Sequence, residues 1–423
     1  MLEKLYTGAC YLALPWVWLR LKRRARLQPE YGQRLAERLG YYPGPAAEAA
    51  NLVWLHTVSV GEFLAAQPLI EALLARGDLQ LLITTTTPTG SAQVRERLGE
   101  RVQHVYLPYD LPPAIHRFLD HFKPRLLLVM ETELWPNLLR LCRKRGIDSV
   151  LVNGRLSARS ARGYRRVAGL TRTMLSNLTL ALMQYPADAE RLRGLGMAPE
   201  RVAVCGSIKF DLPVPAALKQ QAQALRQSWP QAQVWIAAST HPGEEVMVLA
   251  ALALLKAQQP DTLLILAPRH PERRVEIESL CADWQVAVRS EGDAVTAATD
   301  ILLLDTLGEL MLFYGAADIA LVGGSLVEHG GHNLVEPAAW GKPVLSGPHR
   351  FNFASLAEAM AEAGGLLTVT NAAELAATLT ELMSDSARAQ MLGEQARQFA
   401  QSNRGALARI LAAVAPMLPA STR

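Results

Sequence analysis

Residues 323–343, GGSLVEHGGHNLVEPAAWGKP, decide how the second half of this chain folds. The apolar run 319–322 before them predicts a buried strand, and the adjacent glycines 330–331 allow backbone conformations that other residues avoid. Asn333 is a good N-cap for a helix from about Leu334 to Trp340. A strand, a glycine-rich loop and a helix start in this order predict one repeat of a parallel α/β sheet.

Two interpretations of this segment stay open from the residues alone. In the first, the N–H groups at the helix start hold a nucleotide phosphate, and Glu336 accepts hydrogen bonds from both ribose hydroxyls. In the second, the segment is an ordinary strand-to-helix connection, which also uses glycine and an Asn cap. The chain contains neither a Walker loop nor the G-x-G-x-x-G fingerprint, so neither of those nucleotide sites is predicted.

Two series of apolar strands alternate with helical patterns, which predicts parallel sheets covered on both faces. The first series is expected at 52–58, 80–85, 102–107, 125–130, 149–152, 179–183 and 202–205, and the second at 234–238, 262–267, 286–289, 301–304, 319–322 and 344–345. Both series open alike, with VWLHTVSVGE at 53–62 and VWIAASTHPGEE at 234–245. This weak internal repeat predicts two Rossmann-like domains that face each other, with ligands at the carboxyl ends of their strands.

We therefore expect three parts: an N-terminal membrane anchor at 1–26, a first Rossmann-like domain at 27–212 that binds the acceptor, and a second at 213–423 that binds the nucleotide. A short basic helix is expected at 31–40. The final helix, about 386–417, is long enough to pack back on the first domain.

Composition excludes several classes of function. The chain has 423 residues and is 50% hydrophobic, which is enough for two sizeable cores. Its net charge of +4 is too mild to indicate nucleic-acid binding. The four cysteines lie far apart and form no C-x-x-C motif, which favours a reducing compartment.

The N-terminus is typical of a membrane-associated segment. Residues 5–19 carry no charge, and five basic residues follow within 20–26. The apolar stretch is short for a full span, and Pro15 interrupts it, so we expect it to lie in the interface or to span with help from Leu21. The basic cluster predicts that the body of the protein lies on the cytoplasmic side. The alternative is a buried amphipathic helix of the first domain.

Charged residues follow several strands of the first domain. Glu62, in the expected loop 59–62, is placed to accept a proton from an attacking hydroxyl; the alternative is a first-turn glutamate whose pKa the helix dipole lowers. Glu131 and Glu133 share one face after the fourth strand. Lys209 can neutralise charge on a departing phosphate, or it can simply pair with Asp211.

The second domain offers three loops at one end of its sheet. Pro268 and Arg269 follow its second strand, and arginine is suited to bidentate phosphate contact. Thr306 to Glu309 follows its fourth strand, where the backbone can approach a base or ribose. With Asn333 to Glu336, these loops predict a phosphate site.

No metal site is predicted, because the chain lacks H-E-x-x-H and a D-x-D that would hold a cation. His329 and His332 are interpreted as loop or ligand contacts instead. Six arginines between Arg155 and Arg172 form a basic patch, which is either a solvated helix face or a surface that meets an anionic acceptor or lipid head groups.

Eight segments, spread over nearly the whole chain, resemble a known family. They are SVGE at 59–62, TPTGS at 87–91, YLPYDLP at 106–112, METELWPN at 130–137, NGRLSARS at 153–160, GSIKFD at 206–211, PRHPER at 268–273 and GGSLVEHGGHNLVEPA at 323–338. In order and spacing they resemble the Kdo (3-deoxy-D-manno-octulosonic acid) transferases of Gram-negative bacteria. Relatives often carry Asn-Ala-Arg and Asn-Pro-Leu-Glu where this chain has NGR at 153–155 and NLVE at 333–336, which are mild changes.

The resemblance implies a GT-B fold and an inverting, metal-independent transfer of Kdo from CMP-Kdo to the lipid A precursor, without a cofactor. It also implies attachment to inner-membrane lipids on the cytoplasmic side. Glu62 would be the general base, and Glu131 and Lys209 would stabilise the transition state. CMP would be held by Pro268, Arg269, Leu307, Gly308, Glu309, Asn333, Leu334, Val335 and Glu336.

Three alternatives stay open. The first is another GT-B transferase acting on a lipid-linked sugar, such as a heptosyl or N-acetylglucosaminyl transferase. The second is a nucleotide-sugar epimerase of the same fold, which would need no membrane anchor. The third is a catalytically silent scaffold, against which the presence of Glu62, Lys209 and Arg269 argues.

Overall fold

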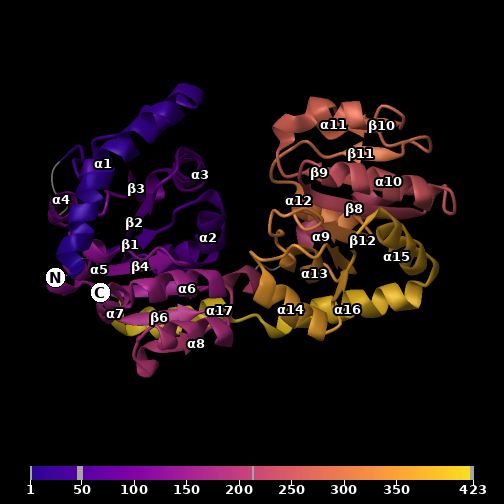
Figure 1. Ribbon diagram of the computed structural model, residues 1–423. Helices are drawn as coiled ribbons and strands as arrows, with labels where there is room; N and C mark the ends of the chain where they lie inside the picture. The colour runs from indigo at the N-terminus through magenta and orange to yellow at the C-terminus, as the bar shows by residue number, and fades with distance from the viewer. Residues whose placement is uncertain (1, 45–50, 212–213, 420–423) are drawn as a thin grey trace. The chain divides into compact units, whose positions relative to one another are not determined.

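The computed structural model describes residues 2–44, 51–211 and 214–419, and the chain divides into two compact units. The first unit runs to Asp211 and takes in the residues from Arg404 onward, whereas the second extends from Leu212 to Asn403. In each unit a parallel sheet lies between helices (Figure 1). The last part of the chain therefore returns to the first unit, where helix α17 (Ala406–Val414) packs against helix α2 (Val60–Leu74).

The first unit contains a seven-stranded sheet of order β3-β2-β1-β4-β5-β6-β7, in which every pair is parallel. Its strands are β1 Leu52–His56, β2 Gln80–Thr85, β3 Gln103–Tyr106, β4 Leu126–Met130, β5 Asp148–Gly154, β6 Leu180–Met183 and β7 Val202–Val204. Its helices are α1 Leu2–Leu27, α2 Val60–Leu74, α3 Pro88–Leu98, α4 Pro112–Phe122, α5 Pro136–Lys144, α6 Ala158–Arg166, α7 Ala168–Ser176, α8 Pro186–Gly194 and α17 Ala406–Val414.

The second unit also contains seven parallel strands, in the order β10-β11-β9-β8-β12-β13-β14. They are β8 Gln233–Thr240, β9 Thr262–Pro268, β10 Val286–Val288, β11 Ile301–Leu303, β12 Ile319–Val322, β13 Val344–Ser346 and β14 Leu366–Thr368. The helices are α9 Ala216–Gln227, α10 Glu244–Lys256, α11 Arg274–Leu280, α12 Leu310–Ala316, α13 Val335–Ala339, α14 Ala354–Glu362, α15 Ala372–Ser384 and α16 Ser386–Ser402.

The alternation of side chains along the strands builds a core on each face of a sheet. In β1, Leu52 and Trp54 join one buried apolar cluster, and Val53 and Leu55 join the cluster on the opposite face. All four side chains are fully buried. A strand that is apolar on both faces can only lie inside a sheet with helices on both sides, as the sequence predicted.

The thirteen expected strands are all present, with ends that differ by at most two residues. A fourteenth, β14, was not predicted, because it is only three residues long and its last two residues are partly or fully exposed. Its short LLT run therefore lacks the buried apolar signal of its neighbours.

Two predicted helices are wrong. Residues 31–40 form no α-helix; the structure has the short 3₁₀ turns Pro29–Gly32 and Glu37–Leu39 there. The expected helix 386–417 is broken into α16 and α17, because Gly405 has a φ of 86° that no helix allows. The Asp211 carboxylate accepts hydrogen bonds from the backbone N–H groups of Gly405 and Leu407, which fixes the start of α17.

Helix α1 is docked to the first unit by its amino-terminal end. The Tyr6 hydroxyl donates to the Asp110 carboxylate, and the Thr7 hydroxyl donates to the Asn137 side chain. The other end of α1 projects away from the sheet in Figure 1. Leu12 is 84% exposed and Trp16 62% exposed, so α1 is not the buried helix of the alternative interpretation. Among the described residues, no helix is long and apolar enough to cross a membrane.

Candidate active site

The order of strands marks one position in each sheet where a ligand can enter. The chain runs outward from β1 to β3 and then returns to place β4 on the other side of β1. In the second sheet β12 returns in the same way beside β8. Loops diverge at such a switch point and leave a crevice at the carboxyl ends of the two strands. Glu62 and Glu131 follow β1 and β4, and residues 323–336 follow β12.

Glu62 lies in the first turn of α2, not in the loop that the sequence suggested. The helix begins at Val60, and the Ser59 hydroxyl accepts a hydrogen bond from the Glu62 N–H. The Glu62 carboxylate turns back and accepts from the N–H of Val58, at 2.8 Å. The side chain is thereby held at the end of β1.

Burial dominates the electrostatics of Glu62. The pKa of this carboxyl is raised to about 8, chiefly by burial, and the nearby charges of Glu131 and Glu133 act in the same direction. The Val58 hydrogen bond and the Arg155 guanidinium act in the opposite direction but are weaker. The net shift is upward, opposite to the lowering that the alternative interpretation of Glu62 implied.

Glu131 lies between two cations. Its carboxylate is 3.2 Å from Arg155 Nε and 3.5 Å from Lys209 Nζ. Lys209 thus pairs with Glu131, and the Asp211 carboxylate, its alternative partner in the sequence, accepts hydrogen bonds from the start of α17. The structure thus brings together three predicted residues, Glu62, Glu131 and Lys209, in one part of the first unit.

The backbone around this cluster is held in unusual conformations. Glu131 has a φ of 56° and Asn153 a φ of 52°, in the left-handed region that residues other than glycine rarely adopt. The Asn153 side-chain oxygen accepts from the N–H of Ile208, which ties the Lys209 turn to the end of β5. The Thr132 hydroxyl donates to the carbonyl of Arg155. Strain of this kind collects at functional sites, where neighbouring contacts enforce it.

In the second unit, one fully buried carboxylate organises the glycine-rich loop. Glu244, the first residue of α10, accepts four backbone N–H hydrogen bonds, from His241, Gly324, Ser325 and Leu326, at 2.6–2.9 Å. The sequence analysis did not single out Glu244. The repeat that aligns Gly243-Glu244 with Gly61-Glu62 was the available signal.

The helix expected after this loop is shorter than predicted. Helix α13 begins at Val335 and ends at Ala339. The Asn333 side-chain oxygen accepts from the Val335 N–H, and its amide donates to the Glu336 carboxylate at 3.0 Å. Leu334, whose backbone is helical, occupies the capping position that we expected Asn333 to fill.

The two other predicted nucleotide loops differ in how their side chains are used. Pro268 ends β9, and Arg269 follows it with an exposed side chain. The Glu309 carboxylate is bound by Arg289 at 2.6 Å and by the Thr306 hydroxyl, and the Arg289 hydrogen bond lowers its pKa. Leu307 is 80% exposed, and Gly308 has a φ of 88°. This loop can offer a ligand its backbone, whereas its carboxylate is already occupied.

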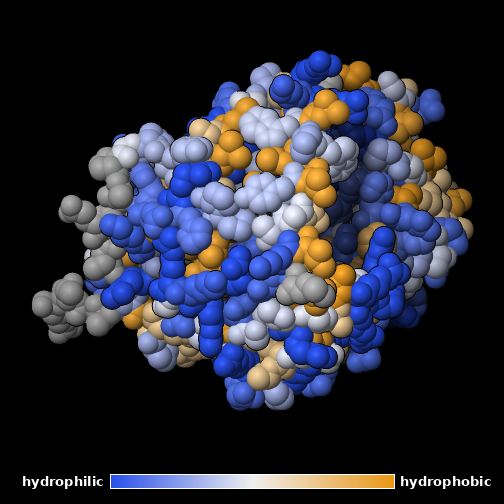
Figure 2. Space-filling model, turned by 60° about the vertical axis from the view of Figure 1, so that its left-hand side comes forward, coloured by the Kyte–Doolittle hydropathy of each residue, from blue (hydrophilic) through white to orange (hydrophobic). Residues whose placement is uncertain are grey.

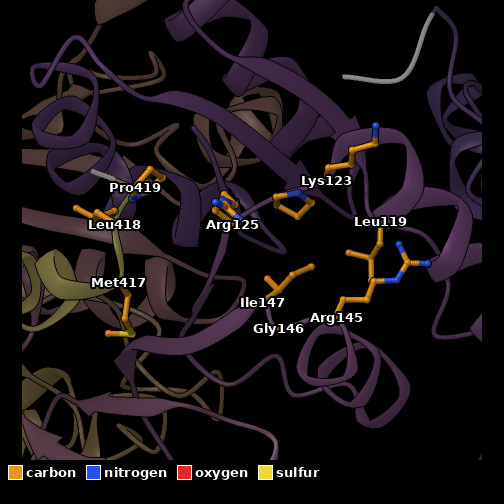
Figure 3. Close-up of a pocket in the computed structure, with 10 residues that line it drawn as sticks. Leu119, Lys123, Arg125, Arg145, Gly146, Ile147, Met417, Leu418 and Pro419 are labelled. Atoms are coloured by element: carbon orange, nitrogen blue, oxygen red, sulfur yellow. The ribbon is translucent and has the colours of Figure 1, made fainter. Parts of the chain in front are cut away.

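A cavity of about 450 Å³ lies at the opposite edge of the first sheet. Arg125 and Ile147 on its wall directly precede β4 and β5, and Met417 closes another side (Figure 3). It is therefore distinct from the cluster around Glu62, which lies at the carboxyl ends of the strands.

The basic patch of the first unit divides into two parts. Arg155 belongs to the cluster around Glu131, whereas Arg159, Arg162 and Arg165 are exposed on α6. Figure 2, in which the first unit comes forward, shows scattered hydrophobic residues among hydrophilic ones. Arg155 was predicted only as a member of the patch, because its contact with Glu131 depends on two separate strands.

Comparison with known families and proteins identifies relatives for nearly the whole chain. Residues 33–212 match the family of 3-deoxy-D-manno-octulosonic-acid transferases (kdotransferases), and residues 238–399 match the glycosyl transferases of group 1. A 3-deoxy-D-manno-octulosonic acid transferase of Haemophilus influenzae is 40% identical over 418 residues, 98% of either chain. The corresponding protein of Bordetella pertussis is 39% identical over 425 residues, 97% of this chain and 98% of the relative.

Among solved structures, UDP-GlcNAc 2-epimerase from Neisseria meningitidis, bound to UDP-GlcNAc, is similar in fold. The TM-score is 0.59 at 16% identity, and the match covers 86% of this chain and 100% of that one. The two parallel sheets, the group 1 match and this likeness confirm the expected GT-B class with two Rossmann-like domains. At this identity the likeness says nothing about which reaction the chain catalyses.

Proposed function

The chain belongs to the Kdo transferase family of glycosyltransferases, and from this premise we propose that it transfers Kdo from CMP-Kdo to the lipid A precursor, lipid IVA, with inversion. The acceptor hydroxyl oxygen bonds to the anomeric carbon of Kdo from one face. The bond from that carbon to the phosphate oxygen breaks on the other face, and CMP departs. The hydroxyl proton passes to a carboxylate of the enzyme.

The observation that carries this proposal is the position and environment of Glu62. Its carboxyl lies at the switch point of the first sheet, and burial raises its pKa to about 8. A carboxylate with a raised pKa is a stronger base, and a pKa near the working pH is suited to general-base catalysis. Glu62 is therefore assigned as the residue that takes the proton of the attacking hydroxyl.

The two cations beside Glu131 can balance the negative charge that develops on the leaving phosphate. Arg155 and Lys209 flank the Glu131 carboxylate, so two positive charges lie beside it. A departing nucleoside monophosphate carries a single phosphate group, which such cations can neutralise. We assign Glu131 as the residue that positions Arg155 and Lys209 and, with Lys209, stabilises the transition state.

CMP is assigned to the loops at the carboxyl edge of the second sheet. Pro268 and Arg269 follow β9, Leu307 to Glu309 follows β11, and Asn333 to Glu336 follows β12. These strands lie in one sheet, so their loops meet at one edge. Because Arg289 occupies the Glu309 carboxylate, the 307–309 loop is expected to contact CMP through its backbone.

Chelation tests the proposal that no metal ion takes part. Lysine and arginine side chains are expected to supply the positive charge, so EDTA should leave the transfer rate within about twofold of the untreated rate. A divalent ion that restores a rate abolished by EDTA would refute this mechanism.

We also propose that α1 lies on the cytoplasmic surface of the inner membrane. It exposes Leu5, Leu12 and Trp16, and its last turns carry exposed basic residues. Apolar anchors next to cations favour an anionic lipid interface. The variant Leu12→Glu with Trp16→Glu should reduce co-sedimentation with phosphatidylglycerol vesicles, and undiminished binding would contradict the assignment.

The decisive experiment is to incubate the protein with CMP-Kdo and lipid IVA and to analyse the lipid by mass spectrometry. We expect the lipid mass to increase by one or more Kdo residues, and CMP to be released in equal number. Parallel reactions with ADP-heptose and UDP-N-acetylglucosamine should give no product. Consumption of either of these donors in place of CMP-Kdo would establish one of the other transferases, and a changed sugar nucleotide without lipid product would establish an epimerase.

A further inference from the structure

Four histidine side chains gather at the switch point of the second sheet. His241 follows β8, His270 follows β9, and His329 and His332 lie in the loop after β12. The His241 ring is stacked on His329 at a centroid distance of 4.1 Å and on His332 at 5.1 Å, and meets His270 edge-on at 5.8 Å. Three neighbouring strands thus deliver four imidazoles to one place.

The loop is built to admit these rings. Gly324 has a φ of 66°, and a Cβ atom there would lie 2.8 Å from the His332 ring and 3.4 Å from the His241 ring. The Glu244 carboxylate holds the N–H of Gly324 and the N–H of His241 in the same hydrogen-bond network. Buried backbone contacts therefore fix the surroundings of the His241 and His332 rings, whereas His270 and His329 are exposed.

Charged groups of both signs surround the cluster. Arg269 has no salt-bridge partner within the described part of the chain. Arg273 is paired with Glu245 and Glu276, and Glu272 lies 3.2 Å from His270. The remaining carboxylates are Glu244, which is occupied by backbone N–H groups, and the exposed Glu328 of the same loop.

The His241 and His332 rings are neutral in this environment. His241 Nε2 and His332 Nε2 are 2.8 Å apart, so one ring must donate and the other accept. The pKa of both histidines is lowered to about 4, chiefly by burial, and the neighbouring imidazoles and Arg269 act in the same direction. A negative charge beside the rings would reverse this effect, because it favours the protonated form.

We propose that His241, His270, His329 and His332, together with Arg269, form a binding site for an oxyanion, and that the imidazoles take up protons when the anion enters. An anion fits better than a metal cation because the Arg269 charge acts on the His241 and His332 rings and would repel a cation. This inference rests on the proposed function for the identity of the anion. CMP-Kdo offers two candidates with the same chemistry, the phosphate and the carboxylate of the sugar.

Proton uptake can be measured directly by titration calorimetry at pH 7 in buffers of different ionisation enthalpy. CMP supplies the phosphate, free Kdo supplies the carboxylate, and cytidine supplies neither. We expect cytidine to bind without proton uptake, and CMP or Kdo to bind with uptake of about one proton. If CMP binds with proton uptake and Kdo does not, the anion bound at this site is the phosphate. If Kdo binds with proton uptake and CMP does not, it is the carboxylate. For each proton taken up, the Kd should rise about tenfold per pH unit above neutrality.

Two histidine variants separate a role in binding from a role in folding. His332→Gln removes a half-buried ring, and His329→Gln removes an exposed one. Each should weaken binding of the linked anion about tenfold at pH 6.5 and flatten the pH dependence. His116→Gln, an exposed histidine of α4 in the first unit, is the matched control and should change neither.

Several outcomes would overturn the inference. They are CMP and Kdo binding without proton uptake, unchanged pH slopes in both histidine variants, or tight zinc binding that shifts the imidazole NMR signals of all four rings. If CMP-Kdo is used as a donor and no uptake occurs, the inference fails while the proposed function stands. If CMP-Kdo is not a donor but inorganic phosphate binds with proton uptake, the anion site stands and the proposed function fails.

Discussion

The two units place a glutamate at corresponding positions, after Gly61 and after Gly243, and use it in opposite ways. Glu62 accepts a backbone hydrogen bond from Val58, and burial raises its pKa to about 8. Glu244 is fully buried and accepts four such bonds, three of them from the loop at 324–326.

This difference follows from how well the carboxylate is satisfied. A buried carboxylate that accepts four backbone hydrogen bonds is held in place by them, so it stabilises a loop. A buried carboxylate with few donors is poorly solvated as an anion and binds a proton readily. The same Gly-Glu pair can therefore build a loop in one unit and accept a proton in the other.

The largest effect is expected when Glu244 is removed. Glu244→Ala leaves four buried N–H groups without their acceptor, which should cost about 3–5 kcal/mol of unfolding free energy. Urea denaturation measures this loss, and CMP binding should fall with it because the 323–336 loop loses its support. Glu362→Ala, which removes an exposed glutamate of α14, is the control. A Glu244→Ala protein as stable as that control would remove the contrast between the two units.

The cations of the first unit should have a smaller effect, and it should be confined to the reaction. Lys209→Ala removes one of the two positive charges beside Glu131 and should reduce the transfer rate about 10²-fold. CMP affinity should fall much less than the transfer rate, because Lys209 is assigned to the charge that develops as the phosphate departs. Lys144→Ala, at an exposed position of α5, should behave like the unmodified protein. Equal rates in the two variants would show that Lys209 only supports the fold.

The smallest effect concerns the stability contributed by Glu62 itself. The pKa of this carboxyl is raised in the folded state from 4.5 to about 8, so the folded protein loses stability as pH rises from 4.5 through 8. Glu62→Gln cannot ionise and can still accept from Val58. Thermal unfolding at pH 5 and pH 8.5 should show that the variant gains about 1 kcal/mol or more relative to the unmodified protein at the higher pH, a shift of about 2–4 °C. A difference that is the same at both pH values would mean that Glu62 is not desolvated.

The positions of the strands could be predicted from the sequence more accurately than those of the helices. Buried parallel strands are continuous apolar runs, and thirteen were located to within two residues. The three-residue β14 lacks that signal, and the break between α16 and α17 depends on the conformation of Gly405 and its contact with Asp211. Local patterns cannot reveal contacts between residues that are nearly two hundred positions apart.

In the candidate site, too, the contacts between distant residues could not be predicted from local sequence patterns. Glu62, Glu131 and Lys209 were predicted from their positions after strands and from the family resemblance, and the structure brings them into one cluster. The direction of the pKa shift at Glu62 was not predictable, because it depends on burial by the assembled fold. The role of Glu244 depends on a loop eighty residues away. The expected crevice between the two domains stays a prediction.

The most direct test of the account is to measure transfer and CMP binding in the same Glu62 variants. Transfer of Kdo to lipid IVA should fall by about 10²–10⁴-fold or more in Glu62→Gln, and Glu62→Ala should abolish it, because neither side chain can take the proton. CMP affinity, measured by calorimetry on the same samples, should stay within about twofold of that of the unmodified protein. Transfer that persists within tenfold, or CMP binding that is lost together with it, would contradict the assignment of Glu62 as the general base.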